Sequence, residues 1–170
     1  MPVHRFALLM LPAVLTIEVD FRDGMKVAVA PEVVFALLSD IYRSGRHFPG
    51  VDELRPVNDE GRWRWRLKER GFGPVKLRVE YDAVYRSDPT THRVYWEPPA
   101  DGAGDMESSG SWEIDPDGDG GSHIRFWALT TAHIPAPRMM ASMVEPIAAQ
   151  ELKRLKGEYI AAIRRTLVES

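Results

Sequence analysis

Cysteine is absent from this 170-residue sequence. A chain without thiols forms no disulfide framework, offers no thiolate to a metal and has no cysteine nucleophile. An excess of positive charge is also missing, because the formal net charge at pH 7 is −3. Nucleic-acid-binding domains normally show a strongly basic balance, so we expect no nucleic-acid partner.

Long hydrophobic runs are missing as well. The most signal-like stretch is the start of the chain, MPVHRFALLMLPAVL, which is far shorter than the roughly 20 apolar residues that span a bilayer. It begins like an export signal, but Pro12 interrupts it and no small-residue cleavage site follows. We expect a cytoplasmic protein in which residues 1–13 form an N-terminal extension or lead into a strand, with export as the minority alternative.

Catalytic and metal-binding motifs are scarce. None of the five histidines belongs to a recognisable pairing motif. The acidic residues from Asp115 to Asp119 begin like a calcium loop, yet its twelfth position is Phe126, where such a loop needs a glutamate. A polar hairpin turn explains this segment better, and we predict no metal and no cofactor.

The residues that are present suit a single α+β domain over residues 1–170. With 44% hydrophobic residues, the chain can bury one sizeable core. Turn signals and apolar runs predict a first strand over 16–29, broken at Asp23 and Gly24, and then short helices over 30–40 and 41–51. Alternating apolar and polar residues predict an antiparallel meander with strands over 62–68, 75–85, 92–97, 108–114 and 123–131.

A long amphipathic helix is predicted over residues 138–168, with apolar residues three or four positions apart. Its apolar face comprises Met140, Val144, Ile147, Leu152, Leu155, Tyr159, Ile163 and Leu167, and its polar face Lys153, Arg154, Lys156, Arg164 and Arg165. Pro146 leaves two alternatives, a kink within the helix or a helix that begins near the proline.

This order of elements resembles the START-related SRPBCC superfamily. The resemblance is carried by VAPEVVFALLSD with FPGV after it, by GSWEIDP, and by IPAPRMM before the last helix. It implies a helix-grip fold, in which a curved antiparallel sheet wraps around a long C-terminal helix, with two short helices after the first strand. It also implies a deep apolar cavity, which relatives use for lipids, quinones, polyketides, hormones or aromatics. Some relatives are polyketide cyclases or aromatases; others, similar to coenzyme-Q-binding proteins or to a small component of carbon monoxide dehydrogenase, bind or deliver.

Candidate ligand-binding residues follow from the alternation along the predicted strands and from the start of the last helix. They are Trp65 (or Trp63), Tyr81, Tyr85, Trp96, Trp112, Phe126, Thr130, His133, Met139, Met140 and Met143. Aromatic rings and hydroxyls on the inner face of the sheet suit a mostly apolar pocket with a few polar groups. The alternative is that these side chains only fill the core.

The predicted function is therefore the non-catalytic binding or transport of a small hydrophobic or aromatic molecule. The alternative is an enzyme of the polyketide cyclase or aromatase type, which a titratable residue inside the cavity would favour. A third hypothesis comes from the turn GFGP, which could bring Lys68 near Lys76 and Arg66 near Arg78. Such a basic patch could face an anionic membrane or partner surface.

Overall fold

The computed structural model describes residues 13–170, which form a seven-stranded antiparallel sheet and a long C-terminal helix. The sheet has the strand order β1-β9-β8-β7-β6-β3-β2. Its strands are β1 (Val14–Val27), β2 (Val51–Pro56), β3 (Arg62–Leu67), β6 (Glu80–Asp88), β7 (Arg93–Glu97), β8 (Met106–Asp117) and β9 (Gly121–Pro135). The other elements are helices α2 (Pro31–Ser39) and α3 (Ile41–Gly45), the 3-10 turn η1 (Arg138–Met140), helix α4 (Ala141–Val168), and the short strands β4 (Arg70–Phe72) and β5 (Val75–Leu77).

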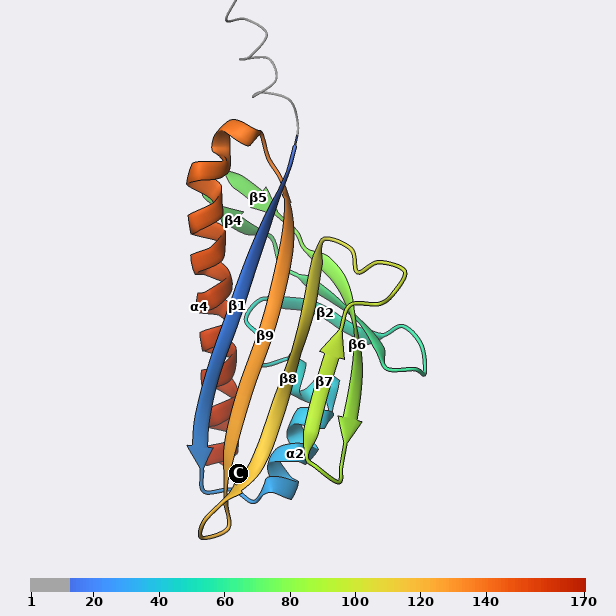
Figure 1. Cartoon of the computed structure of the whole chain (residues 1–170), viewed down its shortest axis with the longest axis vertical. Helices are drawn as coiled ribbons and strands as arrows, with labels where there is room; N and C mark the ends of the chain where they lie inside the picture. The colour runs from blue at the N-terminus through green and yellow to red at the C-terminus, as the bar shows by residue number, and fades with distance from the viewer. Residues whose placement is uncertain (1–12) are drawn as a thin grey trace, which may run out of the picture.

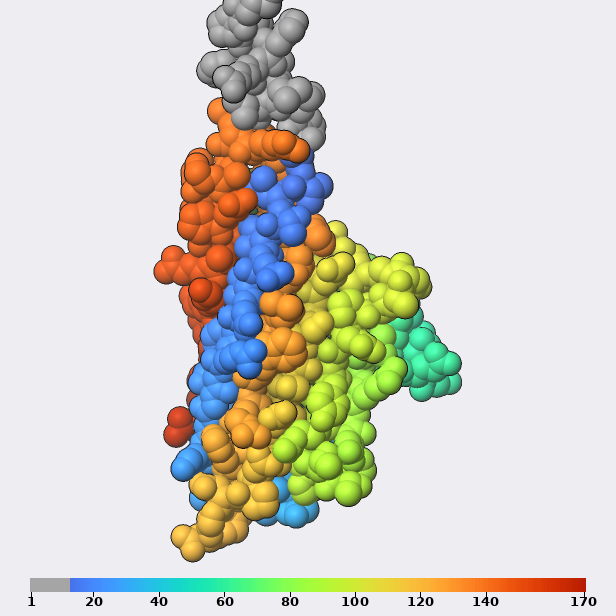
Figure 2. All heavy atoms as spheres, viewed as in Figure 1, coloured from blue at the N-terminus to red at the C-terminus, as the bar shows by residue number. Residues whose placement is uncertain are grey.

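Helix α4 runs along the sheet beside β1 and β9, so the core lies between the helix and the inner face of the strands (Figure 1). The β4–β5 hairpin lies near the N-terminal end of α4, and α2 lies near its C-terminal end (Figure 1). Alternating side chains of β8 and β9 are buried, as expected for strands with one face on the core. The opposite face of the sheet is seen in Figure 2, where β1, β9, β8 and β7 lie side by side.

The first strand is continuous, so the predicted break at Asp23 and Gly24 is wrong. β1 pairs with β9 in one register along its whole length, and Asp23 and Gly24 lie opposite Phe126 and Arg125. The long partner strand supplies the hydrogen bonds that an isolated Asp-Gly turn would otherwise have to replace. The acidic segment near Asp119 does form the turn between β8 and β9, as predicted.

The two short helices are confirmed at α2 and α3. Pro31 occupies the first turn of α2, where its missing N–H costs little, and the side chains of Val34 and Leu38 are completely buried. Asp40 separates the helices and caps α3, because its carboxylate accepts a hydrogen bond of 3.0 Å from the backbone N–H of Arg43.

The predicted strand over 75–85 is divided, and this removes the basic patch. β5 ends at Leu77 and pairs only with β4, whereas β6 begins at Glu80 and pairs with β3. Lys76 therefore lies opposite Gly71 instead of Lys68. On the outer face, Arg66 and Arg78 both approach the carboxylate of Asp52, at 3.3 and 3.8 Å. Acidic neighbours thus compensate the arginines on which the hypothesis of a membrane or partner surface depended.

Helix α4 begins at Ala141 and contains Pro146, and it is preceded by the separate turn η1. The proline is thus inside the helix, five residues after its first residue. The predicted apolar face is buried from Val144 to Leu167, except that Ile147 is 40% exposed. No helix among residues 13–170 is both long and apolar enough to cross a bilayer. The signal-like start of the chain lies almost entirely outside the described residues.

Candidate functional site: a cavity under the C-terminal helix

A cavity lies between the inner face of the sheet and α4. Its volume is about 60 Å³, counted as the space open to the centres of water molecules. Eight of the residues that line it are aromatic: Phe48, Trp65, Tyr81, Tyr85, Trp96, Trp112, Phe126 and Tyr159. Eight more are aliphatic, from Leu38, Ile41, Leu67, Val94, Met106, Ala128, Leu152 and Leu155, and only four are polar, namely Ser44, Ser108, Thr130 and Lys156. The site is therefore an apolar cavity with a few polar groups.

The aromatic rings contact one another around the cavity and reduce its volume. Trp65 and Tyr81 are stacked, with ring centroids 6.0 Å apart and an interplanar angle of 12°. Phe126 lies at the centre of a second group, 4.6 Å from Trp112 and 5.8 Å from Trp96 between ring centroids. Ligand pockets usually enclose about 300–1,000 Å³. A ligand of more than a few atoms therefore requires some of these rings to move apart.

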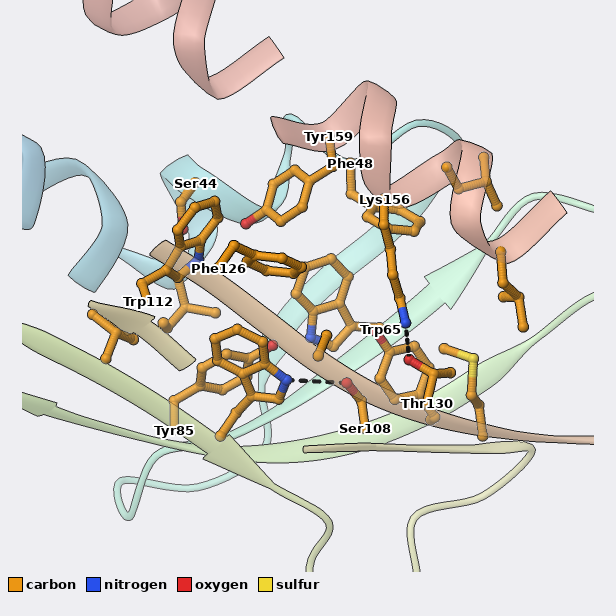
Figure 3. A pocket seen from close by; sticks show the side chains of 18 of the residues that line it. Ser44, Phe48, Trp65, Tyr85, Ser108, Trp112, Phe126, Thr130, Lys156 and Tyr159 are labelled. Atoms are coloured by element: carbon orange, nitrogen blue, oxygen red, sulfur yellow. Dashed lines mark hydrogen bonds between the residues drawn. The ribbon is translucent and has the colours of Figure 1, made fainter. Parts of the chain in front are cut away.

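Lys156 is the one residue with a charged side chain that lines the cavity (Figure 3). It is only 6% exposed, and its Nζ donates a hydrogen bond to the hydroxyl of Thr130 on β9. Burial lowers the pKa of the Lys156 amine to about 8, against a smaller opposing effect of Asp20. No carboxylate within residues 13–170 lies within 4.0 Å of this amine. The cavity thus contains a titratable group whose charge no acidic side chain neutralises directly.

The placement of Lys156 on the polar face of the helix is wrong. Residue 156 follows Leu152 by four positions and precedes Tyr159 by three, so it lies on the buried side together with them. The helical period alone could have placed it there. Its charge led to the wrong assignment, because a lysine among apolar neighbours usually lies at the edge of the apolar face with its amine in water.

The remaining polar groups lie on both sides of the cavity. The indole N–H of Trp96 donates to the hydroxyl of Ser108 at 3.0 Å, within the buried interior (Figure 3). The Nε1 atom of Trp65 is also buried and makes no hydrogen bond of normal geometry with the described residues. It still acts on Tyr85, whose pKa burial raises well above its usual value and Trp65 slightly lowers. Trp65 therefore offers a donor that a bound acceptor could satisfy.

The three tyrosines of the cavity are neutral at physiological pH. Burial raises the pKa of Tyr159 to about 12 and that of Tyr81 further still. Their hydroxyls can accept or donate hydrogen bonds, but they do not supply a phenolate at neutral pH. Lys156 is consequently the side chain of this cavity that can exchange a proton near neutrality.

Most of the predicted ligand-binding residues come together here. Seven of the eleven line the central cavity, namely Trp65, Tyr81, Tyr85, Trp96, Trp112, Phe126 and Thr130. Trp63, the alternative to Trp65, is not among the lining residues and is only partly buried. The strand alternation found these residues because the sheet carries them on one face.

The other four predicted residues lie elsewhere. His133 lines a smaller neighbouring cavity of about 20 Å³, between the β4–β5 hairpin and the sheet. Met139 and Met143 are 51% and 48% exposed, and Met140 is partly buried against the core. None of the three methionines lines the central cavity. Phe48 and Tyr159, which do line it, were not among the predicted residues.

Solved structures with the same fold include enzymes. The Zhui aromatase/cyclase from Streptomyces sp. R1128 matches with a TM-score of 0.64 at 12% identity, over 91% of this chain and 94% of that chain. Norcoclaurine synthase from Thalictrum flavum matches with a TM-score of 0.57 at 13% identity, over 96% and 92%. A conserved protein from Geobacillus kaustophilus matches with a TM-score of 0.62 at 14% identity, over 89% and 96%. These similarities confirm the helix-grip α+β fold.

No curated protein sequence matches the chain. The family described as "Polyketide cyclase / dehydrase and lipid transport" matches residues 18–159, a segment that includes most of the sheet and the part of α4 that carries Lys156. This match agrees with the SRPBCC resemblance and covers most of the chain. The chain therefore belongs to the polyketide cyclase/dehydrase and lipid-transport family of helix-grip proteins.

Proposed function

We propose that this protein binds one small aromatic or apolar molecule, non-covalently, in the cavity between the sheet and α4. The observation that carries the proposal is the lining itself, in which eight aromatic and eight aliphatic side chains surround a space that they do not fill. Close packing is the rule in protein interiors, so an unfilled aromatic cavity next to buried polar groups is typical of a binding site.

The polar groups support binding over ordinary core packing. Lys156 and the indole of Trp65 are both buried, and neither has a full set of hydrogen-bond partners among the described residues. A core that served stability alone would gain by replacing them with apolar side chains. A ligand with acceptor atoms would satisfy both groups.

Tryptophan fluorescence tests this proposal, because Trp65, Trp96 and Trp112 all line the cavity. The purified protein is titrated with quinones, polyphenols and fatty acids, and thermal unfolding is measured with each compound. Saturable quenching together with a raised melting temperature is expected for one class of compound. A flat response to the whole panel would contradict the proposal.

Two alanines of β9 provide a matched pair of variants. Ala128 lines the central cavity, whereas Ala132 lies on the same face one step further along and lines only the smaller cavity. Ala128→Val should weaken binding by about tenfold through added volume in the site. Ala132→Val adds the same volume outside it and should leave the affinity within about twofold. Equal losses in both variants would indicate a general packing effect instead of a ligand site.

A second candidate function is a cyclase-type enzyme, and Lys156 is the observation that favours it. A general base works best when its pKa lies near the working pH, and burial lowers the pKa of Lys156 to about 8. The amine could remove a proton from a carbon between two carbonyl groups, as in the first step of a cyclisation.

Exchange of deuterium into 1-phenyl-1,3-butanedione tests this step. Wild-type protein should accelerate the exchange, and Lys156→Met should abolish the acceleration. Lys153→Met is the control, since Lys153 is an exposed lysine on the same helix. Exchange at the uncatalysed rate with the wild type would leave binding as the supported function.

A further inference from the structure

We infer that the cavity selects a ligand that carries an oxygen acid, whose anion pairs with the amine of Lys156. This inference rests on the proposed function and names the class of molecule. A carboxylate, a phenolate and the enolate of a β-dicarbonyl compound share the required chemistry, which is a negatively charged oxygen next to an aromatic or apolar body.

The charges around Lys156 carry the inference. Its direct partner is the hydroxyl of Thr130, and the tyrosines that share the cavity, among them Tyr159 one turn along the helix, are neutral phenols. Asp20 of β1 is the acid that acts on the amine from a distance. Its side chain is 53% exposed and is already engaged by Trp127 and Arg22. A buried ammonium usually has a carboxylate or another anion beside it, and within the described residues none lies in contact with this one.

The position of the amine defines how such a ligand would lie. Thr130 and Ser108 are paired residues on neighbouring strands, so their hydroxyls and the Lys156 amine form a polar end of the cavity (Figure 3). The rings of Phe126 and Trp112 line the cavity beside it. We therefore place the acidic group of the ligand at Lys156 and its apolar body among the rings.

The protonation state of Lys156 gives the inference a pH signature. With a pKa of about 8, the amine is about nine-tenths protonated at pH 7, and the empty cavity then carries a positive charge. Above pH 8 the amine loses its proton and its attraction for an anion. Affinity for an acid should therefore fall by about tenfold for each pH unit above that value, while affinity for a neutral analogue should not follow this curve.

The test compares cinnamate with cinnamamide, which differ in the charge of one group. Binding of each is measured by calorimetry between pH 6 and 10 to the wild type, Lys156→Met and the control Lys153→Met. We expect cinnamate to bind at least about tenfold more tightly than the amide to the wild type and to Lys153→Met. The preference should disappear in Lys156→Met. The dye 4-nitrophenol gives a second readout, because its bound anion is visible by absorbance at a pH where the free phenol is neutral.

The outcomes separate the two proposals. If the acid and the amide bind equally to the wild type, the cavity binds ligands but the selection of an acid is wrong. If the preference survives in Lys156→Met, another group is responsible and the inference also fails. If neither compound nor the dye binds, the proposed function itself is contradicted. The ¹³Cε signal of Lys156 checks folding and charge together, since its titration midpoint near pH 8 should rise when cinnamate is added.

Discussion

At the scale of single residues, two buried charged side chains differ in how they are neutralised. The carboxylate of Asp82 on β6 is 3% exposed and accepts hydrogen bonds from Arg62 at 2.7 Å and Arg64 at 2.8 Å. Lys156 is similarly buried but bonds only to a hydroxyl. Paired burial stabilises a fold or leaves it unchanged, whereas unpaired burial costs free energy. The two residues should therefore respond to neutralisation in opposite ways.

Lys156→Met should increase the free energy of unfolding at pH 7 by about 1–3 kcal/mol. The folded-state pKa of about 8 lies below the ordinary value of 10.5, so between these values the unfolded chain holds a proton that the folded chain has released. Stability of the wild type should therefore increase as pH rises from 8 to 10, and this increase should be missing in the variant. Urea unfolding at several pH values measures the difference. Identical pH profiles would show that the amine is not buried as the structure indicates.

Asp82→Asn should decrease the free energy of unfolding at pH 7 by about 2–3 kcal/mol, because two arginines lose a charged partner. Burial raises the pKa of Asp82, but the hydrogen bonds from Arg64 and Arg62 outweigh it and hold the pKa below its usual value. The stabilisation is thus present above the unfolded-state pKa of about 3.9 and is lost as pH falls below it. Acid unfolding should begin at higher pH in the wild type than expected for a chain without this pair, and the variant should lack that dependence. A variant as stable as the wild type at pH 7 would refute the assignment.

At the scale of elements, α4 shows how a helix can accommodate a proline near its start. Pro146 lacks the N–H that would bond to the carbonyl of Ser142, but both residues are exposed. Water can therefore satisfy the free carbonyl. The buried side chains from Val144 to Leu167 hold the helix against the sheet in spite of this lost bond.

Pro146→Ala should stabilise the protein by about 1–2 kcal/mol, less than the full helix-interior cost of proline because water offsets part of it. The midpoint of urea unfolding measures the gain. Glu145→Ala, a neighbouring exposed position, is the control and should change stability by no more than about 0.5 kcal/mol. A loss of stability in Pro146→Ala would mean that the proline is needed to set the entry from η1 into the helix.

At the scale of the whole molecule, the β4–β5 hairpin is connected to the rest by side chains more than by strand pairing. Arg70 of β4 donates to the carbonyl oxygen of Pro49 at 3.1 Å and to Glu151 of α4 at 3.3 Å. Phe72, at the end of β4, is 5% exposed and lines the smaller cavity. One arginine thus joins the hairpin, the segment after α3 and the long helix.

Arg70→Ala should cost about 1–2 kcal/mol and should increase amide hydrogen exchange in β4 and β5 more than elsewhere. Arg154→Ala is the matched control. Arg154 has the larger effect in lowering the pKa of Glu151, yet it is 47% exposed, and solvent screens such a pair. Its removal should cost no more than about 0.5 kcal/mol. Equal exchange across all strands in Arg70→Ala would show that the hairpin does not open independently.

The local elements and the class of fold could be predicted from the sequence alone. Period-two alternation depends on neighbouring residues, so it placed β3, β7, β8 and β9 and brought Trp65, Trp112 and Phe126 to the inner face. The three-to-four spacing likewise predicted the C-terminal helix and most of its buried side. The other features depend on tertiary contacts. Whether Asp23 and Gly24 end a strand depends on β9, a hundred residues away, and whether Lys156 reaches water or a cavity depends on Thr130 of the same strand. Local patterns carry no information on such distant partners, because burial of a charge is decided by every element that packs around it.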